Sequence, residues 1–533
     1  MVLDQGERDS ATAEPGNIAA ALVETAHRTP AATALVAERH ISYAELLSLV
    51  AQAEARLSSL GVRRGDRVAI VAGSTPEHVA NWYAVLGLGA ISVEINFLLA
   101  DAEWARILDD CAPTAILADD RFLSRVRALA GPDTQVAAIS WPRPHLAPMS
   151  WVPSPMQGSD PAVIAYTSGT TGLPKGVVHT HRAIAAQLSL LVREVGYDAT
   201  WVVYQSTPLF SLPGFLPQVA TTLQVGATAL LADKFDPVAF AQASLRYPIS
   251  YTVLSSPMVP RLLAEIEKGQ LDLSHLKVLS CGGAPLHPEV ASEFRRIAGV
   301  SLTEGYAMTE MMGAFVMDLD GEAPWGASGR IYPRETQVLC ILDDADRPVK
   351  DDEIGEIAVH ADYVAKRYWP NHAVQLAGGR WFRTGDIGRI DPDGFVFLLD
   401  RKKDVIIRGG FNIYSAEIER VLVADARVLE ATVIGVPDPG VGEVPVAYVV
   451  LADGVPNDAV PHLLAEVTDV LGRLKRPEAI HAVQFDALPR NALGKVQKAT
   501  LRAAAAGSGL TTLLPAAPTL SQQRTHPSDS GEN

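Results

Sequence analysis

The sequence predicts an α/β protein with a large N-terminal domain and a smaller α+β C-terminal domain. Its length of 533 residues exceeds the usual length of a domain with a single hydrophobic core, so we expect at least two domains. Short apolar runs alternate with amphipathic helical patterns through the first half of the chain, which is typical of sheets flanked by helices. After about residue 325 the pattern becomes antiparallel, and a fresh α+β pattern begins beyond residue 404.

The expected elements of the first part begin with helix and strand signals in regular order. Ser42 followed by Glu45 has the pattern of a capping box, and its helix should run to about Ser59. Residues 68–72 predict a buried strand, and Thr75 predicts the cap of a second helix. Further short buried strands are expected at residues 91–95, 115–118, 162–166, 252–254 and 278–280.

The later part predicts antiparallel pairing. Strands are expected at residues 336–342 and 355–360, and a turn at 391–394 should join strands 387–390 and 395–398.

A charged segment at residues 400–404 lies between two apolar strands, which suits either a solvated turn or a domain junction. Beyond it we expect a helix from Ser415, strands near Val433 and Val446, and a helix over about 458–471. The predicted domains are therefore residues 17–402 and 404–504, with disordered tails at 1–16 and 505–533.

Composition excludes several classes of protein. The net charge of −16 argues against a general nucleic-acid or anionic-membrane surface, since both need clustered Lys and Arg. The sequence contains no run of about 18 apolar residues, so no membrane span is predicted. The polar N-terminus lacks the basic and apolar blocks of a signal peptide. The 3 cysteines are far apart and lack metal-ligand spacing. We expect a cytoplasmic protein, a monomer or homodimer, with no nucleic-acid partner and no membrane span.

The most informative stretch follows the apolar run at residues 162–166. Residues 167–176 hold three glycines, four hydroxyl side chains and Lys175, a composition that lets backbone N–H groups and one cation surround a polyphosphate. Because Lys175 is followed by Gly176, the stretch differs from the P-loop of common NTPases. The ordinary alternative is a Gly/Ser/Thr-rich surface linker.

Four further segments could each be an ordinary turn or loop when considered alone. They are residues 282–285 (GGAP), 305–310 (GYAMTE), 383–386 (RTGD) and 489–495 (PRNALGK). Together, and in this order after residues 167–176, they resemble the adenylate-forming superfamily. That family contains acyl-CoA synthetases, 4-coumarate–CoA ligases, firefly luciferase and the adenylation domains of peptide synthetases. The resemblance covers about residues 17–502.

The resemblance implies a large N-terminal domain of two helix-flanked β-sheets plus a small distorted β-barrel, and a mobile C-terminal domain. It implies that residues 167–172 wrap the β- and γ-phosphates, that Tyr306 stacks on adenine, and that Asp386 accepts hydrogen bonds from the ribose with Arg401 nearby. A structural salt bridge between Asp386 and Arg401 is the alternative. The full set of implied ATP contacts is Thr167, Ser168, Gly169, Thr170, Thr171, Gly172, Gly283, Ala284, Glu304, Gly305, Tyr306, Thr309, Asp386 and Arg401.

Three implied catalytic residues are Lys495, Thr309 and Lys175, and the implied magnesium ligand is Glu310. Attack of a carboxylate on the α-phosphorus brings two anions together, so an ammonium and a divalent cation would offset the developing charge. Phosphoryl transfer needs positioning more than a protein nucleophile. The chain accordingly shows no GxSxG elbow and no HExxH motif.

The same resemblance implies a second half-reaction, in which a thiol of coenzyme A attacks the acyl-adenylate and releases AMP. In the family the C-terminal domain rotates between the two halves about the position of Lys403. The segment containing Gly409, Gly410 and Phe411 would then line the thiol tunnel. The implied cofactors and co-substrates are ATP, Mg²⁺ and coenzyme A.

Two positions depart from the family pattern. Ser211 stands where many acyl-CoA synthetases have histidine, and Ile407 stands where several coumarate-type ligases have lysine. No Asp follows Phe210 to pair with a substrate ammonium, which disfavours an amino-acid substrate. The expected acid pocket is small or apolar and comprises Ser211, Pro213, Ser255, Ala307, Met308 and Gly313, although the same residues could simply pack in the core.

The resulting expectation is an acyl-CoA synthetase for a medium-chain or aromatic carboxylic acid. One alternative keeps the adenylation and passes the acyl group to the thiol of a carrier protein. Another activates a non-carboxylate oxyanion such as nitrite for transfer to an amine. A third alternative is a nucleotide-binding regulator without catalysis, which the presence of Lys495 and Glu310 disfavours.

Overall fold

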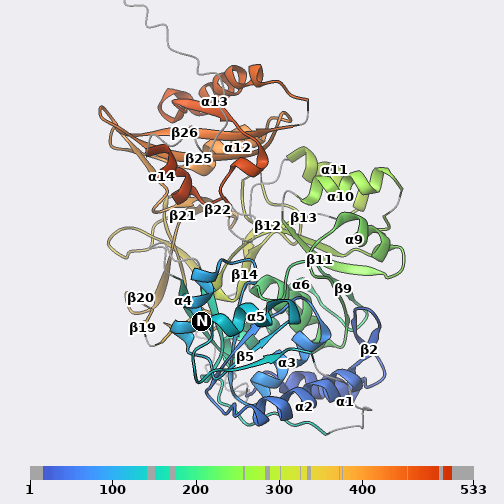
Figure 1. Cartoon of the computed structure of the whole chain (residues 1–533). Coiled ribbons are helices and arrows are strands. Elements are labelled where there is room, and N and C mark those ends of the chain that lie inside the picture. The colour runs from blue at the N-terminus through green and yellow to red at the C-terminus, as the bar shows by residue number, and fades with distance from the viewer. Residues whose placement is uncertain are drawn as a thin grey trace, which may run out of the picture. The chain divides into compact units, whose positions relative to one another are not determined.

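The computed structural model describes most of the chain, in two compact units. One unit extends to Leu398 and the other begins at Leu399, a few residues before the junction expected near Lys403 (Figure 1). The described residues are 16–140, 150–167, 174–255, 258–269, 271–282, 288–300, 302–324, 326–332, 338–370, 372–374, 376–452, 454–490 and 496–506.

The first unit contains a nine-stranded sheet of order β15-β14-β13-β12-β11-β9-β10-β1-β2. The pairs from β1 to β13 are parallel, and antiparallel pairs with β2, β14 and β15 close the two edges. The strands are β1 (Thr33–Val36), β2 (His40–Ser42), β9 (Val202–Gln205), β10 (Thr228–Leu231), β11 (Ile249–Ser255), β12 (Val278–Gly282), β13 (Leu302–Met308), β14 (Gly313–Met317) and β15 (Arg330–Ile331).

A second sheet of eight strands has the order β19-β18-β8-β7-β4-β3-β5-β6. Its parallel part runs from β7 to β6, and β8, β18 and β19 add antiparallel pairs. The strands are β3 (Arg67–Val71), β4 (Ile91–Glu94), β5 (Ala115–Ala118), β6 (Gln135–Ala138), β7 (Pro161–Thr167), β8 (Lys175–Thr180), β18 (Arg367–Tyr368) and β19 (His372–Ala373).

Helices connect the parallel strands, as the alternating sequence pattern predicts. Ser42 Oγ accepts a hydrogen bond from the Glu45 N–H at 3.2 Å, and the helix that follows ends at Ser59, which confirms the predicted capping box. Thr75 caps the next helix as expected. The helices are α1 (Ala20–Arg28), α2 (Tyr43–Ser59), α3 (Pro76–Gly87), α4 (Asp101–Cys111), α5 (Asp120–Leu129), α6 (His181–Val195), α7 (Leu212–Phe215), a π-helical turn (Leu216–Ala220), α8 (Thr221–Val225), α9 (Pro237–Ser244), α10 (Val259–Glu267) and α11 (Pro288–Ala298).

A third sheet, of antiparallel strands, lies in the first unit apart from residues 399–401 at its end, which belong to the second. Its order is β16-β17-β21-β20, and β22 pairs with β21. The predicted turn at 391–394 is present, with the Gly394 N–H donating to the Asp391 carbonyl at 2.9 Å. The strands are β16 (Leu339–Leu342), β17 (Gly355–Val359), β20 (Leu376–Ala377), β21 (Trp381–Ile390) and β22 (Val396–Arg401).

The second unit, orange to red in Figure 1, has the α+β pattern that the sequence predicts. Its sheet has the order β24-β23-β26-β25, with β27 beside β26. Gly472 has a φ of 80° and interrupts α13 one residue beyond the predicted helix end. The helix α14 ends at Ala506, whereas the sequence placed the start of the tail at residue 505. The elements are β23 (Ile406–Arg408), β24 (Phe411–Ile413), α12 (Ser415–Val423), β25 (Val428–Asp438), β26 (Gly442–Leu451), α13 (Val460–Lys475), β27 (Ala479–Ala482) and α14 (Lys498–Ala506).

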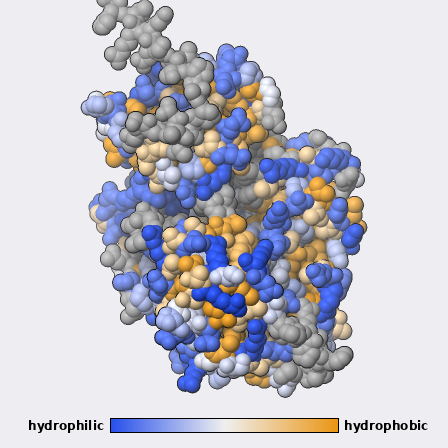
Figure 2. Space-filling view, in the orientation of Figure 1, coloured by the Kyte–Doolittle hydropathy of each residue, from blue (hydrophilic) through white to orange (hydrophobic). Residues whose placement is uncertain are grey.

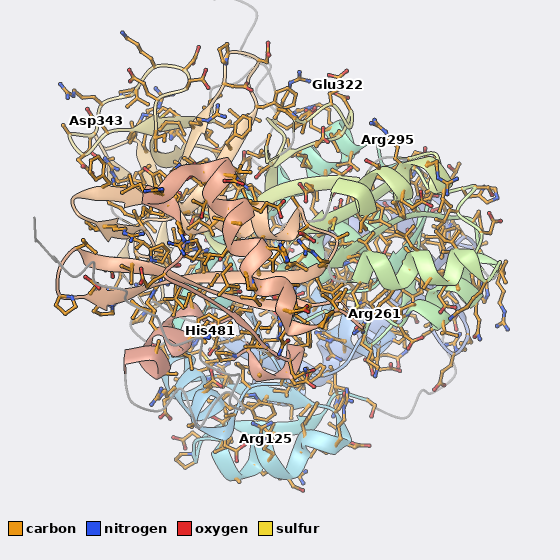
Figure 3. The ribbon with its side chains drawn as sticks, turned by 90° about the horizontal axis from the view of Figure 1, so that it is seen from above. Arg125, Arg261, Arg295, Glu322, Asp343 and His481 are labelled. Carbon is orange, nitrogen blue, oxygen red and sulfur yellow. The ribbon has the colours of Figure 1, made fainter. Side chains whose placement is uncertain are left out.

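The surface mixes polar and apolar residues. Hydrophilic and hydrophobic residues are interspersed on the face drawn in Figure 2. Arg125 of α5, labelled in Figure 3, places its guanidinium 3.5 Å from the centre of the Trp104 ring, so this charged group packs on an aromatic side chain. Of the helices within the described ranges, none combines the length and apolar character needed to cross a bilayer.

Candidate active site

The predicted phosphate loop connects two neighbouring strands of the second sheet. Thr167, the last residue of β7, pairs with Lys175, the first residue of β8, so the two ends of the loop lie opposite each other. A Cβ at Gly176 would lie 2.8 Å from Ile164 Cγ2, which explains why glycine follows the lysine here. Five predicted phosphate contacts lie outside the described residues: Ser168, Gly169, Thr170, Thr171 and Gly172.

Two histidines after the loop are buried and structural. The pKa of His179 is lowered to about 3 by burial, and that of His181 is lowered to about 4, also by burial. The His181 Nδ1 accepts a hydrogen bond from the Ile18 N–H at 3.2 Å, which ties the N-terminal segment to this site. Both rings are therefore neutral near pH 7. Among the described residues of β7 and β8, the positive charge is that of Lys175.

Tyr368, which the sequence analysis missed, lies between two predicted site residues. It belongs to β18, which pairs with β8 through the partners Tyr368 and Val177. The Lys175 ammonium lies 5.8 Å from the centre of the Tyr368 ring, and the Tyr368 hydroxyl donates to Glu310 Oε1 at 3.2 Å. Burial, with the nearby Glu310 charge, raises the pKa of Tyr368, so its hydroxyl stays a donor. The three residues therefore form one connected polar group.

Glu310 is held by a turn at the end of β13. Residues Thr309–Met311 form a single 3-10 turn, closed by the Met312 N–H donating to the Thr309 carbonyl at 3.1 Å. The Glu310 carbonyl accepts a hydrogen bond from the Ala365 N–H at 2.7 Å, so a segment outside the turn also holds the backbone of Glu310. The predicted residues Gly283 and Ala284 lie outside the described residues. Glu304 and Gly305 lie on β13 itself.

The structure brings Tyr306 and Asp386 together. The Tyr306 hydroxyl donates to Asp386 Oδ2 at 2.6 Å, and the two residues are 6% and 3% exposed. A short hydrogen bond to a buried carboxylate fixes both groups. The two positions predicted to contact adenine and ribose are therefore neighbours. Arg401 belongs to the second unit, so its predicted role at the ribose stays a prediction.

A β-bulge aims Asp386. Arg383 pairs with Ala358 and Ile387 pairs with Glu356, so three residues of β21 stand opposite the single Ile357 of β17. Gly385, in the middle of the bulge, has a φ of 77°, a value that favours glycine. The Thr384 hydroxyl donates to the Ile357 carbonyl at 2.8 Å and so replaces the lost ladder bond.

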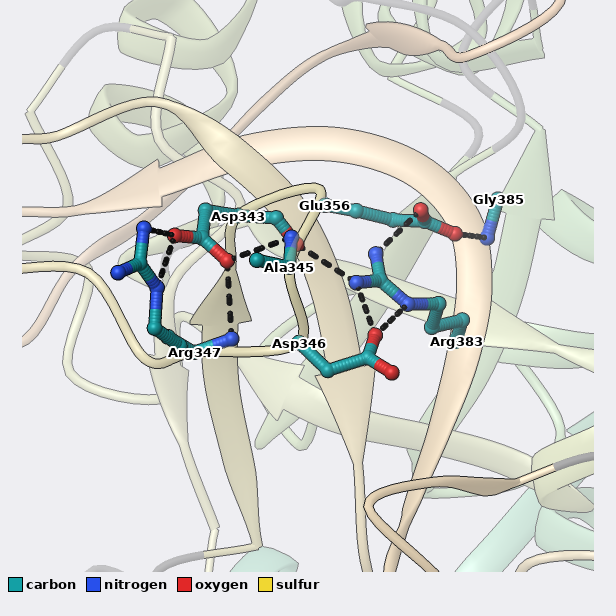
Figure 4. Close-up of polar contacts among 7 residues, drawn as sticks. All are labelled: Asp343, Ala345, Asp346, Arg347, Glu356, Arg383 and Gly385. Carbon is teal, nitrogen blue, oxygen red and sulfur yellow. Dashed lines mark hydrogen bonds and ion pairs between the residues drawn. The ribbon is translucent and has the colours of Figure 1, made fainter.

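An ion-pair network supports this bulge (Figure 4). Arg383 donates to Glu356 Oε2 at 2.7 Å and to Asp346 Oδ1 at 2.9 Å, and Glu356 Oε1 accepts from the Gly385 N–H at 3.1 Å. The guanidinium also donates to the Asp343 carbonyl at 2.6 Å. Glu356 is 6% exposed, so its bonds to Arg383 and Gly385 are screened from water, whereas the Asp346 side chain is 46% exposed. The local RTGD sequence gave no sign of Glu356, which lies on another strand.

An apolar cavity lies beside the predicted acid site. Ser211 lines it, and its hydroxyl also caps α7 by accepting from the Gly214 N–H at 3.2 Å. Pro213 and Ala307 are exposed, which argues against core packing for these two, and Met308 is partly buried. The Ser255 side chain lies outside the described residues. The cavity lining comprises Trp82, Glu94, Val163, Ala165, Leu209, Phe210, Ser211, Leu212, Phe215, Leu216 and Met312.

Gly313 lies beside α6 and not in that lining. A Cβ there would lie 3.0 Å from the Gln187 Nε2, so a larger residue would displace this side chain. The acid-pocket roles of Pro213, Ala307, Met308 and Gly313 stay predictions.

In the second unit, Gly409 and Gly410 form the turn between β23 and β24, with φ values of 58° and 83°. The Gly409 N–H donates to the Val441 carbonyl at 2.6 Å, and Phe411 is 60% exposed. Ile407, on β23, is 54% exposed. This hairpin therefore presents backbone and apolar side chains to solvent.

The expected catalytic Lys495 lies outside the described residues. The described residues on either side of it are paired, because Arg490 forms a bridge with Val496 and the Gln497 N–H donates to the Pro489 carbonyl at 2.7 Å. Arg490 also forms an ion pair with Glu430 at 2.6 Å. The hinge role of Lys403 stays a prediction.

Comparison with known proteins gives matches along nearly the whole chain. Residues 22–369 match the family "AMP-binding enzyme", and residues 417–495 match "AMP-binding enzyme C-terminal domain". An indoleacetate–CoA ligase from Aromatoleum aromaticum is 34% identical, over 87% of this chain and 93% of that protein.

Solved structures agree with that match. The anthranilate–CoA ligase AuaEII in complex with anthranoyl-AMP is similar at a TM-score of 0.83 and 25% identity, over 93% of this chain and 98% of that one. The amide bond synthetase McbA from Marinactinospora thermotolerans is similar at a TM-score of 0.82 and 28% identity, over 91% of this chain and 99% of that one.

Proposed function

The chain belongs to the family of AMP-binding enzymes, and we propose on that basis that it is an acyl-CoA synthetase. It uses ATP to convert a carboxylic acid into an acyl-adenylate and then transfers the acyl group to coenzyme A. The observation that carries the proposal is the joint presence of the Thr167–Lys175 strand pairing, the Glu310 turn and the Tyr306–Asp386 pair in a chain of this family.

In the first half-reaction a carboxylate oxygen attacks the α-phosphorus of ATP, and the bond to pyrophosphate breaks. Lys175 and the loop that precedes it offset the charge of the leaving pyrophosphate, and Thr309 donates its hydroxyl to the α-phosphate. The ammonium of Lys495 is the second cation, and it offsets the charge that develops on the phosphoryl oxygens during the attack. These roles follow from the family and from the residue types, because an ammonium and hydroxyl donors suit a reaction between two anions.

Glu310 fits the role of a magnesium ligand. Mg²⁺ bound to a nucleotide uses only one or two protein carboxylates, so the lack of any cluster of three His, Cys, Asp or Glu among the described residues is no obstacle. Tyr368 already orients the Glu310 carboxylate by a hydrogen bond at 3.2 Å. The ion, when bound there, would offset charge on the phosphate oxygens.

Tyr306 and Asp386 suit the nucleoside. The aromatic ring of Tyr306 offers an apolar face for adenine, and Asp386 offers carboxylate oxygens for the two ribose hydroxyls. The rigid bulge that holds Asp386 limits the entropy lost on binding. Gly283 and Ala284, which have little or no side chain, suit a close approach to the base.

In the second half-reaction the thiol of coenzyme A attacks the carbonyl of the acyl-adenylate, and AMP leaves. Gly409, Gly410 and Phe411 suit the pantetheine arm, since a glycine turn leaves backbone groups accessible. Lys403 is the proposed hinge for the rotation between the two halves.

The acid is proposed to be aromatic or of medium chain length. The similar indoleacetate–CoA and anthranilate–CoA ligases act on aromatic acids, and Trp82, Phe210 and Phe215 line the apolar cavity here. A second candidate, favoured by the similarity to an amide bond synthetase, transfers the acyl group to an amine. Transfer to a carrier-protein thiol is the third acceptor to test.

Two measurements on the full chain test this proposal. Pyrophosphate release is followed with MgATP and a panel of aromatic and aliphatic acids, and products are then identified by mass spectrometry with coenzyme A, a holo carrier protein or an aryl amine. The proposal expects acid-dependent pyrophosphate and an acyl-CoA product. If the main product is an amide or a carrier-bound acyl group, coenzyme A is not the acceptor, but the proposed adenylation of the acid stands.

A further inference from the structure

The apolar cavity beside Ser211 contains one charged side chain. Apart from the indole N–H of Trp82, only Glu94 and Ser211 bring polar side-chain atoms to its lining, and the Ser211 hydroxyl is already used as a helix cap. Glu94 is the last residue of β4, and Val163 and Ala165 of the neighbouring parallel strand β7 line the same cavity. Ligands of parallel sheets bind beyond the carboxyl ends of the strands, and Glu94 lies at that end of β4.

Glu94 is held rigidly by two donors. Its Oε2 lies 2.8 Å from His78 Nε2, and its Oε1 accepts a hydrogen bond from the Ser92 hydroxyl at 2.8 Å. The Glu94 side chain is 8% exposed and that of His78 is 0% exposed. A carboxylate whose rotamer is fixed in this way is a preorganised acceptor.

The partners of His78 define its charge. Its Nδ1 lies 2.9 Å from the Gly73 carbonyl, which can only accept a hydrogen bond, and its Nε2 faces the carboxylate of Glu94. With Glu94 ionised, both ring nitrogens donate, which is the imidazolium form. Burial opposes this charge, but Glu94 raises the pKa of His78 above its usual value. The pair is therefore an ion pair without net charge.

Glu94 has acceptor capacity left over. An ionised carboxylate offers about four lone-pair positions, and the two known donors use two of them. The free space of the cavity is about 20 Å³, which holds about one water-sized group. An aliphatic acid would gain nothing from a carboxylate in this wall, and burying an ion pair there has a desolvation cost. A small hydrogen-bond donor next to an apolar body would use it.

We propose that Glu94 is a specificity-determining residue that accepts a hydrogen bond from an N–H or O–H group on the non-reacting end of the acid. This inference rests on the proposed acyl-CoA synthetase function, because it identifies the kind of acid. Since His78 already balances the charge of Glu94, a neutral donor such as a phenol or an indole N–H is favoured over an ammonium. The cavity has room for the donor group alone, and Trp82, Phe210 and Phe215 form the apolar part of its wall.

Matched acids test the proposal in the wild-type chain without any mutation. Pyrophosphate release is measured with indole-3-acetate against 1-benzothiophene-3-acetate, and with 4-hydroxyphenylacetate against 4-fluorophenylacetate. Each pair keeps shape and removes the donor. A hydrogen bond to a charged group predicts that the acid with the donor has about 10- to 100-fold higher kcat/KM. Equal kcat/KM within both pairs would overturn the role of Glu94.

The variant Glu94→Leu should abolish this preference, mainly by raising KM for the acid with the donor, while kcat/KM for the other acid changes little. Because this variant leaves His78 without its carboxylate, the double variant Glu94→Leu/His78→Leu repeats the measurement without either charge. Leu212→Val, which changes the same wall without a donor or acceptor, should affect both acids of a pair alike. A preference that survives in both Glu94 variants would refute the proposal.

These outcomes separate the two levels of inference. If no acid supports pyrophosphate release in the wild-type chain, the proposed function fails. If acids are activated but the donor makes no difference, the proposed function stands and only the assignment of Glu94 fails.

Discussion

Substitution of Asp386 by Asn tests the nucleoside site in depth. Asp386 is 3% exposed and accepts a 2.6 Å hydrogen bond from Tyr306, so its charge is buried and fixed in place. On the proposed function it also accepts from the ribose hydroxyls of ATP. A hydrogen bond to an ionised group contributes about 1.5–3 kcal/mol, so Asp386→Asn should weaken ATP binding about 10- to 150-fold for each such bond.

The assay combines this variant with nucleotides that lack one hydroxyl. Dissociation constants of ATP and 3′-deoxy-ATP are measured by calorimetry for the wild type and for Asp386→Asn, which gives a double-mutant cycle. If the carboxylate binds the ribose, the two changes are coupled by at least about 1 kcal/mol. Asp352→Asn, on an exposed carboxylate paired with Arg389 in the same unit, is the control and should leave both constants unchanged. Strictly additive effects would refute the contact with the ribose.

Three further predictions concern other parts of the site. Lys495→Ala should lower the rate of adenylate formation by about 10²- to 10³-fold while transfer from preformed acyl-AMP to coenzyme A survives, and equal losses in both half-reactions would contradict the rotation of the C-terminal domain. Tyr368→Phe removes the donor to Glu310 and should raise the KM for MgATP about 2- to 10-fold, whereas an unchanged KM together with an unchanged magnesium requirement would exclude this positioning role. His179 titrates near pH 6.5 in the unfolded chain but has its pKa lowered to about 3 by burial, so the unfolded state binds more protons between these values and the free energy of unfolding falls as the pH drops through that range. Urea titrations at several pH values should show a shallower fall in His179→Leu than in the wild type, and parallel slopes would contradict the assignment.

Features that depend on neighbouring residues could be predicted from the sequence. The capping box of Ser42 and Glu45 needs only a spacing of three residues, and the structure shows both of its hydrogen bonds. The loop after Thr167 follows a buried strand directly, and its return to Lys175 on the adjacent strand is a local connection. The family could be predicted for the same reason, because its motifs are short and occur in a fixed order.

Contacts between distant strands could not be predicted in the same way. Tyr368 reaches the loop lysine only because β18 pairs with β8, and this register joins segments nearly two hundred residues apart. Glu356 supports the bulge before Asp386 because β17 and β21 lose register there, and no local pattern in either strand predicts that shift. Glu94 likewise lines the cavity because its face of β4 meets α3 and α7, and the local sequence does not specify which face that is.

The acid pocket shows the same limit. Small or apolar residues such as Ala307 suit either a pocket or a core, and only the exposure of Ala307 in the structure argues against the core. Sequence patterns record which residues are apolar, but not which elements their side chains face.

The most direct test of the central claim is pyrophosphate exchange by the full chain without coenzyme A. Labelled pyrophosphate is incubated with ATP, magnesium and an aromatic acid, and incorporation of the label into ATP is followed. Reversible attack of the acid on the α-phosphorus predicts incorporation that requires the acid, and addition of coenzyme A should then release AMP. Release of ADP and phosphate, or no incorporation with any acid that binds, would contradict the account.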